Sequence, residues 1–328
     1  MGTLRWGLEE EVFITEPLRP TLQSLYYLAR LLWRNPRKYY LHTACNFTRG
    51  RDCLGGLMSS VEISTGVHRD VGSLVEDLKG RRQELARACP SLLVPLGHLL
   101  DREEPTNISG MHIHISGFSD WEKAYRNVVY FLPLLALAMA NSPVAGNRPF
   151  GYSYRWAHGF ALGPLRPDRY YRFQDVIHAK RLKTLEIRVF DPVWDLDRIR
   201  ILLECLEALV TSPREYPGDI EVYNQLRFRV AREGYIEDLR RLYRELVKLY
   251  PLPEDFLSSP PAVQVRDLWE REGTLSTYSA LDNAYRNGVL APRPLPAVEI
   301  SPFLMLVGFL GYYLPRIPYN LKKVWSEW

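Results

Sequence analysis

The chain has 328 residues, of which 46% are hydrophobic and 24% charged, and a formal net charge of +4. These values are typical of a globular protein with a substantial core, and they lack the concentrated positive charge on which nucleic-acid binding depends. A membrane span is not predicted, because the apolar runs from Phe131 to Ala140 and from Phe303 to Leu314 are shorter than the roughly 20 residues of a spanning helix. We expect both runs to be buried core helices; the second is also suited to contact a partner subunit in a homo-oligomer.

The N-terminus leads directly from Met1 into an acidic, strand-like segment, without the basic and apolar regions of a secretory signal peptide. None of the four cysteines belongs to a Cys-x-x-Cys pair, so a zinc ribbon or a thioredoxin-like motif is not indicated. A cytoplasmic protein with free thiols is therefore expected. A disulfide between Cys45 and Cys53 is the alternative if the source is a hyperthermophile, because intracellular proteins of such organisms can be rich in disulfides.

The first predicted strand, from Leu4 to Thr15, contains three consecutive carboxylates. Side chains alternate between the two faces of a strand, so Glu9 and Glu11 share one face and Glu10 lies on the other. Two carboxylates on one face of a core strand repel each other, and a hard divalent cation such as Mg2+ removes this repulsion. The alternative is a solvated acidic patch on an edge strand.

Three later strand-like segments show the same division into an apolar and an ionisable face. The ionisable face carries Glu62 in the segment 60–64, His112 and His114 in the segment 109–116, and Glu186 and Arg188 in the segment 184–190. One such strand alone is usually a solvent-facing strand. Four strands whose second faces carry Glu, His and Arg instead indicate a site for metal ions and an anion.

Helical spacing of apolar residues separates these strands. It is found in four segments: 22–33, 71–89, 120–141 and 196–210. Pro133 is expected to kink or divide the third helix, and Asp195 is expected to be the N-cap of the fourth.

The segment 141–175 is rich in Gly, Pro, Arg and Tyr and has little periodicity, which is typical of a binding loop or lid. We expect it to form a rim over the metal site. Arg155 is the candidate in this rim for an anionic substrate group, because Tyr154 and Trp156 would bury its stem and orient its guanidinium. A surface charge is the alternative for this arginine.

The part of the chain from about 213 to 328 is predicted to be mainly helical, and no repeat or clean linker divides the chain. We therefore predict one domain over residues 1–328 of the α+β class. An antiparallel-leaning sheet would carry the site, and helices would cover its outer face.

Four motifs occur in a fixed order: Gly-Leu-Glu-Glu-Glu, Ser-Val-Glu-Ile-Ser-Thr, Ser-Gly-Met-His-Ile-His-Ile and Leu-Glu-Ile-Arg-Val-Phe-Asp. This arrangement, from Trp6 to Pro192, resembles the glutamate–cysteine ligase type 2 family, or carboxylate–amine ligases, of the glutamine-synthetase-like superfamily. The resemblance implies an antiparallel sheet that forms a funnel for ATP, divalent cations (Mg2+ or Mn2+) and an amino acid. It also implies that ATP phosphorylates a carboxylate, typically the side chain of glutamate, and that an amine such as cysteine displaces the phosphate.

Carried over residue by residue, the resemblance implies that five side chains bind metal: Glu9, Glu11, Glu62, His112 and Glu186. Arg188 is similar to a phosphate-contacting arginine, and we predict that Arg188 and Arg155 serve catalysis and nucleotide binding. For Arg188, a salt bridge to Glu186 or to a neighbouring Asp is the structural alternative. The chain departs from some members at Gly55, where they have an acidic residue, and this departure puts a third metal ion in doubt.

Two other functions use the same residues. A metal-dependent hydrolase would account for the Glu and His ligands, but not for the pairing of Glu186 with Arg188 or for the arginine-rich segment. A regulatory relative that binds a nucleotide or an amino acid without catalysis is the second alternative, and the intact set of ionisable residues argues against it. In the favoured interpretation the partners are small-molecule substrates.

Overall fold

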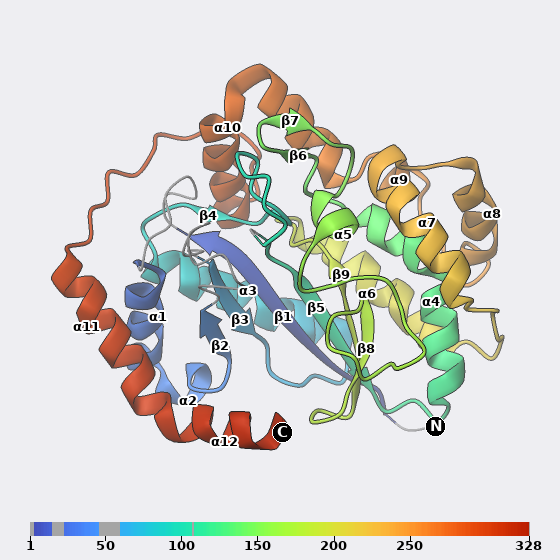
Figure 1. Ribbon diagram of the computed structural model, residues 1–328, viewed down its shortest axis with the longest axis horizontal. Helices are drawn as coiled ribbons and strands as arrows, with labels where there is room; N and C mark the ends of the chain where they lie inside the picture. The colour runs from blue at the N-terminus through green and yellow to red at the C-terminus, as the bar shows by residue number, and fades with distance from the viewer. Residues whose placement is uncertain (1–2, 15–22, 46–59, 107, 328) are drawn as a thin grey trace.

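An antiparallel sheet forms the centre of the computed structural model, which describes residues 3–14, 23–45, 60–106 and 108–327 (Figure 1). The strand order is β2-β3-β1-β5-β9-β8, and β4 pairs with the end of β1. The bounds of these strands are β1 Arg5–Ile14, β2 Thr43–Cys45, β3 Ser60–Ser64, β4 Leu93–Val94, β5 Met111–Ser116, β8 Val176–Ala179 and β9 Thr184–Phe190. The antiparallel sheet and the four expected strands are therefore confirmed.

The pairing register aligns the ionisable positions across neighbouring strands. Glu11 lies opposite Glu62 on β3, and Glu9 lies opposite His112 on β5. Since side chains that face each other across a strand pair point to the same side of the sheet, these residues share one face.

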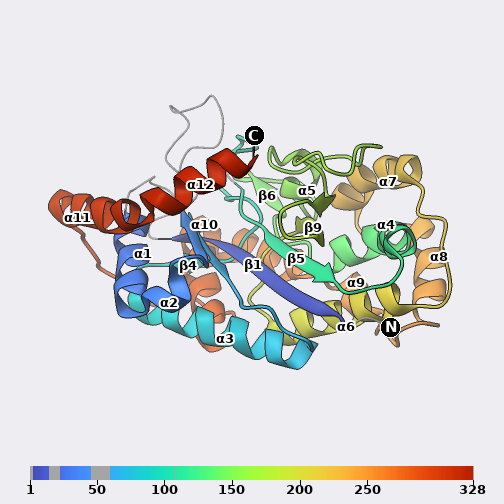
Figure 2. The ribbon, with the colours of Figure 1, turned by 90° about the horizontal axis from the view of Figure 1, so that it is seen from below.

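Helices cover the other face of the sheet, as expected, and Figure 2 shows α3 and α6 on one side of β1 and β5. Apolar residues of the strands, such as Trp6, Ile113 and Ile187, are buried in one cluster with Leu74 of α3 and Leu202 of α6. The bounds of the helices before the C-terminal arm are α1 Gln23–Arg34, α2 Pro36–Tyr39, α3 Val71–Ala88, α4 Trp121–Ala138, α5 Tyr154–His158, α6 Leu196–Thr211, α7 Ile220–Glu233, α8 Glu237–Leu246, α9 Asp255–Ser258 and α10 Pro261–Asn287.

Two local expectations are corrected by these elements. Pro133 does not divide its segment, because α4 runs as one helix through it, and the expected burial of the run from Phe131 to Ala140 is confirmed. The segment 141–175 is more regular than a lid, since it contains the short hairpin of β6 Val144–Ala145 with β7 Arg148–Pro149 and the helix α5.

The N-cap of α6 is Asp195, as predicted, because its carboxylate accepts the backbone N–H groups of the first turn.

The C-terminal arm consists of α11 Pro302–Tyr313, η1 Leu314–Arg316 and α12 Ile317–Glu327, and its first helix, α11, packs on α1 (Figure 1). Gly308 lies against the backbone of Tyr26, where a Cβ atom would come within 2.4 Å of its Cα. The prediction that α11 is a buried core helix is wrong: only Gly308 and Tyr312 are buried, and Phe303 is 70% exposed. Within the described residues, no helix combines the length and the apolar character that crossing a bilayer requires.

The cysteine prediction is tested only in part. Cys89 and Cys205 are free and buried, whereas the Cys45–Cys53 pair and Gly55 involve positions outside the described residues.

Candidate active site

A compact group of ionisable side chains lies on the face of the sheet opposite the helical layer. His112 Nδ1 is 3.5 Å from Glu9 Oε2 and 3.9 Å from Glu186 Oε1, and His114 Nε2 is 3.6 Å from Glu9 Oε1. Glu9, His114 and Glu186 each place one potential ligand atom within 4.8 Å of the others. The strand register therefore produces a cluster from residues that are up to 177 positions apart in the chain.

The donor atoms of this cluster fit a divalent cation. Two carboxylates and an imidazole are a donor set that Mn2+ and similar ions accept, and carboxylates alone suit Mg2+. His112 Nδ1 and His114 Nε2 are buried and have no hydrogen-bond partner in the described structure, which is unusual for buried polar atoms. A cation or a substrate group in the cluster would give both atoms a partner.

Glu11 and Glu62 extend the acidic face towards β3. Glu11 is 1% exposed, and its Oε2 accepts the backbone N–H of Gly110 at 2.8 Å, so this carboxylate is held beside the loop that leads into β5. Glu62 is partly buried on the same face. Their role as ligands of a second ion remains a prediction.

The surroundings of the two histidines shift their pKa values in opposite directions. Burial lowers the pKa of His112, and the nearby Arg188 lowers it further, so the neutral form that binds metals is favoured. Burial also acts on His114, but the close contact with the negatively charged Glu9 outweighs it and raises the pKa of His114. For Glu9, burial alone would raise the pKa, yet the contacts with both histidines hold it well below the usual range.

Arg188 forms an ion pair with Glu186, at 2.5 Å between Nη1 and Oε1. The structural alternative considered from the sequence is thus present in the molecule. The Nε atom of Arg188 is buried and has no hydrogen-bond partner in the described structure, so the guanidinium retains a donor for an anion. The register between β5 and β9 shifts at this point, and such an irregularity redirects side chains at functional sites.

Arg155 is buried beside the cluster, whereas an arginine on a rim over the cluster was expected. It is 2% exposed, and its guanidinium donates 2.9 Å hydrogen bonds to the carbonyl oxygens of Val189 and Arg188. The absence of a side chain at Gly110 permits this arrangement, since a Cβ there would lie 2.2 Å from Arg155 Nη2 and 2.9 Å from His112 Nε2. Arg155 therefore supports the strand that carries Glu186 and Arg188.

Sequence reasoning missed a buried network at the end of β9, around Asp191. The carboxylate of Asp191 accepts the backbone N–H of Asn141 at 2.7 Å and the hydroxyl of Ser142 at 2.8 Å, and it lies 3.7 Å from Arg155. Burial raises the pKa of Asp191. From the sequence, Asp191-Pro192 was interpreted only as the end of a strand. The partners of Asp191 come from segments distant in the chain, so the local sequence pattern does not reveal them. It also omitted His114 from the metal ligands, although its parity with His112 was visible.

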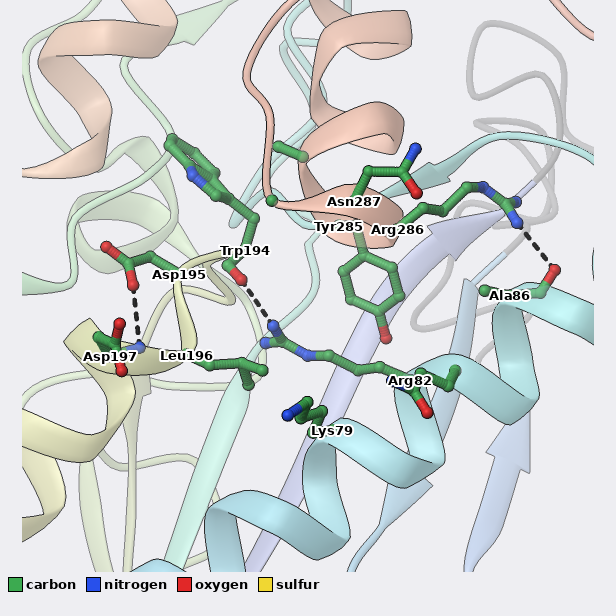
Figure 3. A pocket seen from close by; sticks show the side chains of 13 residues that line it. Lys79, Arg82, Ala86, Trp194, Asp195, Leu196, Asp197, Tyr285, Arg286 and Asn287 are labelled. Carbon is green, nitrogen blue, oxygen red and sulfur yellow. Dashed lines mark hydrogen bonds between the residues drawn. The ribbon is translucent and has the colours of Figure 1, made fainter.

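A cavity of about 430 Å3 opens beside the cluster, and Gly7, Glu9, His114 and Thr184 contribute to its wall. A second cavity, of about 450 Å3, lies among α3, α6 and α10 and is lined by Arg82, Trp194 and Tyr285 (Figure 3). None of the predicted site residues lines this second cavity, and Arg82 uses its guanidinium on Glu10 and on the carbonyl oxygens of Val193 and Trp194. The chemistry therefore points to the first cavity.

No family model and no curated protein matches the sequence. Solved structures do match the fold. A bifunctional glutathione synthetase from Pasteurella multocida aligns with a TM-score of 0.60 at 13% identity, over 87% of this chain and 52% of that one, so the chain spans about half its length. A glutamate–cysteine ligase from Francisella tularensis, solved in complex with AMP, aligns with a TM-score of 0.59 at 12% identity, over 98% and 94% of the two chains.

A chain from the complex between the prokaryotic ubiquitin-like protein Pup and its ligase PafA aligns with a TM-score of 0.51 at 14% identity, over 98% and 83% of the two chains. These likenesses confirm the antiparallel-sheet fold that the four motifs predict. At such identities they bear on the fold alone.

Proposed function

We propose that this chain is an ATP-dependent carboxylate–amine ligase that forms an amide bond. The observation that carries the proposal is the convergence of Glu9, His112, His114, Glu186 and Arg188 on one sheet face beside an open cavity. The structural likeness to a ligase solved with AMP supports a nucleotide as the second ligand.

In this proposal, Glu9, Glu186 and the two histidines would hold divalent cations, with Glu11 and Glu62 as further ligands. Bound Mg2+ or Mn2+ would neutralise phosphate oxygens during phosphoryl transfer. The transfer turns a substrate carboxylate, for which we propose the side chain of glutamate, into an acyl-phosphate. An amine then attacks the acyl carbon, the bond from that carbon to the phosphate oxygen breaks, and phosphate and one proton leave.

The two arginines have different parts in the proposal. Arg188 would contact the transferring phosphoryl group with the donors that its ion pair to Glu186 leaves free, and it would stabilise the charge that develops there. Arg155 would act as a positioning residue, because its guanidinium is already bound to carbonyl oxygens of β9. We further propose that residues 1–328 act as one catalytic domain on small-molecule substrates in the cytoplasm.

The test is ADP release from ATP and Mg2+ in the presence of glutamate and a panel of amines. A ligase releases ADP only when both substrates are present, and mass spectrometry detects the amide. Hydrolysis of a substrate without ATP would instead identify a metal-dependent hydrolase, and ATP binding without turnover would identify a regulatory protein. Glu186→Gln should abolish ADP release, whereas Glu237→Gln, at an exposed position of α8, is the matched control that should not change it.

A further inference from the structure

The helix α11 has apolar side chains on both of its sides, and its sequence contains no charged residue. Gly308 and Tyr312, about one turn apart, are buried on the side that packs on α1. Phe303, Leu306 and Leu310 lie on the opposite side, because about 3.6 residues make one turn, and all three are exposed. A helix that is apolar all round is normally buried on every side. One side of α11 is therefore built for a contact that the single chain does not supply in its described part.

The exposed side of α11 belongs to a larger surface, the apolar stripe. Trp33 adjoins it, since a Cβ atom on Gly311 would clash with the ring of Trp33. The stripe consists of six residues that are 38% to 70% exposed: Phe303, Leu306, Phe309, Leu310, Leu314 and Trp33. Together they expose roughly 600 Å2, taking about 200 Å2 for a fully exposed large side chain. The largest apolar patch on a typical monomer covers about 300–600 Å2, so the stripe is at the upper limit for a protein without a partner.

We propose that the apolar stripe is the interface between two copies of this chain, related by a two-fold axis. Two copies would bury roughly 1,200 Å2 in total, which reaches the range of about 1,200–2,000 Å2 found for stable complexes. Phe303, Leu306 and Leu310 are separated by three and four residues, the spacing with which paired helices interdigitate. A surface that pairs with its own copy about a two-fold axis closes as a dimer. The proposal is independent of the ligase function.

A lipid surface is the other apolar partner, and the charges near the stripe argue against it. Helices that lie in a membrane interface carry lysine and arginine beside their apolar face, whereas residues 300–315 include no charged residue. Arg316, which follows them, is buried and donates to the backbone carbonyl oxygen of Thr43 at 2.8 Å, so its charge is not directed to a lipid headgroup. The stripe therefore suits an apolar protein surface, and a second copy supplies an identical one.

The arm that carries the stripe is bound to its own subunit by polar contacts. The hydroxyl of Tyr40 donates to the carbonyl oxygen of Pro315 at 2.9 Å, and the hydroxyl of Tyr312 donates to that of Thr43 at 3.0 Å. Farther along the arm, Tyr319 of α12 lines the cavity beside the metal cluster. The dimer contact would thus be made by the same arm that completes the wall of the candidate active site.

Sedimentation velocity and light scattering of the full chain at micromolar concentration test the proposal. The wild type should have the mass of two chains. Phe303→Asp and Leu306→Glu should each raise the Kd of the dimer about tenfold or more, because like charges from the two copies would meet in the interface. Asp in the first turn of α11 is also favoured by the helix dipole, so Phe303→Asp should fold normally. Val222→Glu adds a negative charge at an apolar residue of α7 that is 50% exposed, and this matched control should leave the dimer intact.

Circular dichroism should show the same helix content in both stripe variants and in the wild type. If one of them unfolds, the other decides the outcome. A wild-type mass other than that of two chains overturns the proposal, and so does a dimer that both charged variants leave unchanged. A wild type that is monomeric and binds phosphatidylglycerol vesicles, with binding lost in Leu306→Glu, would identify a lipid surface as the occupant and overturn the second copy.

Discussion

The guanidinium of Arg155 donates a 2.9 Å hydrogen bond to the backbone carbonyl oxygen of Arg188, so one arginine holds the strand position of the other. Arg155 reaches this position from the short helix α5, near the middle of the segment 141–175 that the sequence predicted as a rim. Its contact with Val189 secures the same part of β9. The geometry of the proposed phosphate-binding residue therefore depends on a second arginine that is itself buried.

Replacing Arg155 with Lys should lower both stability and kcat. Lysine cannot donate to several carbonyl oxygens in the planar geometry of a guanidinium, so buried carbonyl groups would lose their partners. We expect a loss of about 2–4 kcal/mol in the free energy of unfolding, measured with urea, from the cost of unpaired buried polar groups. Arg148→Lys, in the exposed strand β7 of the same segment, is the control. An unchanged stability with a raised KM for ATP or glutamate would restore the direct substrate contact that was predicted from the sequence.

Replacing Arg188 with Ala should lower kcat about 100- to 1,000-fold, the usual cost of removing a donor that stabilises charge in the transition state. The KM values should change less, because the contact strengthens during phosphoryl transfer. Steady-state kinetics and a thermal melt of the same preparation distinguish the catalytic role of Arg188 from a purely structural one. Near-normal kcat with a lower melting temperature would show that the ion pair to Glu186 is the whole role of Arg188.

Glu10 and Glu9 are neighbours on β1, but removal of their charge should affect different properties: protein stability for Glu10 and metal binding for Glu9. Glu10 is 0% exposed and is bound by Arg82 and by the hydroxyl of Tyr285, so Glu10→Gln leaves a buried guanidinium without its counter-charge. We expect a loss of about 3–5 kcal/mol in the free energy of unfolding. Glu9→Gln should instead weaken Mn2+ binding, measured by titration calorimetry, with a smaller loss of stability than Glu10→Gln. Equal losses of stability in both variants would contradict the division of the strand into a structural and a metal-binding face.

The contact between Glu9 and His114 should make the stability of the metal-free protein depend on pH. The pKa of His114 is raised in the folded state, so its contribution is complete below the unfolded pKa of about 6.5 and is lost as the pH rises through the folded value. The pKa of Glu9 is lowered, so its contribution is present above the unfolded value of about 4.3 and is lost at lower pH, as the pH falls through the folded value. The stabilisation by the pair is therefore greatest between about pH 5 and 6.5.

Thermal melts in EDTA check this prediction. The difference in melting temperature between the wild type and His114→Gln should be largest near pH 6 and should shrink towards pH 9. In a Glu9→Gln background the difference should nearly vanish, because His114 then has lost its main partner. A difference that grows with pH would contradict the predicted sign.

Gly308→Val should detach α11 from α1. The added Cβ would lie 2.4 Å from the Cα of Tyr26, a backbone atom that cannot move aside. Limited proteolysis should then cleave the connection before α11 at least tenfold faster than in the wild type. Gly80→Ala in α3, where a Cβ meets no atom within 4 Å, is the control, and it should raise stability by about 0.5–1 kcal/mol. Equal protease resistance in both variants would show that α11 does not depend on this close approach.

The sequence by itself determined the strands and their faces. Alternation with a period of two is a local property, and it separated Glu9 from Glu10 and aligned His112 with His114 before any partner was known. The order of the four motifs predicted the antiparallel fold, which the structural comparisons confirm.

Tertiary structure alone decided which of these residues meet. His114 joins Glu9 and Glu186 because the register of β5 between β1 and β9 brings their rows together, and register depends on pairing between distant segments. Only the tertiary structure shows that Arg155 of α5 binds carbonyl oxygens of β9, because this contact joins segments that are distant in the sequence; its contact with substrate stays a prediction. The apolar run of α11 was expected in the core, but it lies on the surface, since burial depends on which helix happens to cover a face and hydrophobicity alone does not specify that partner.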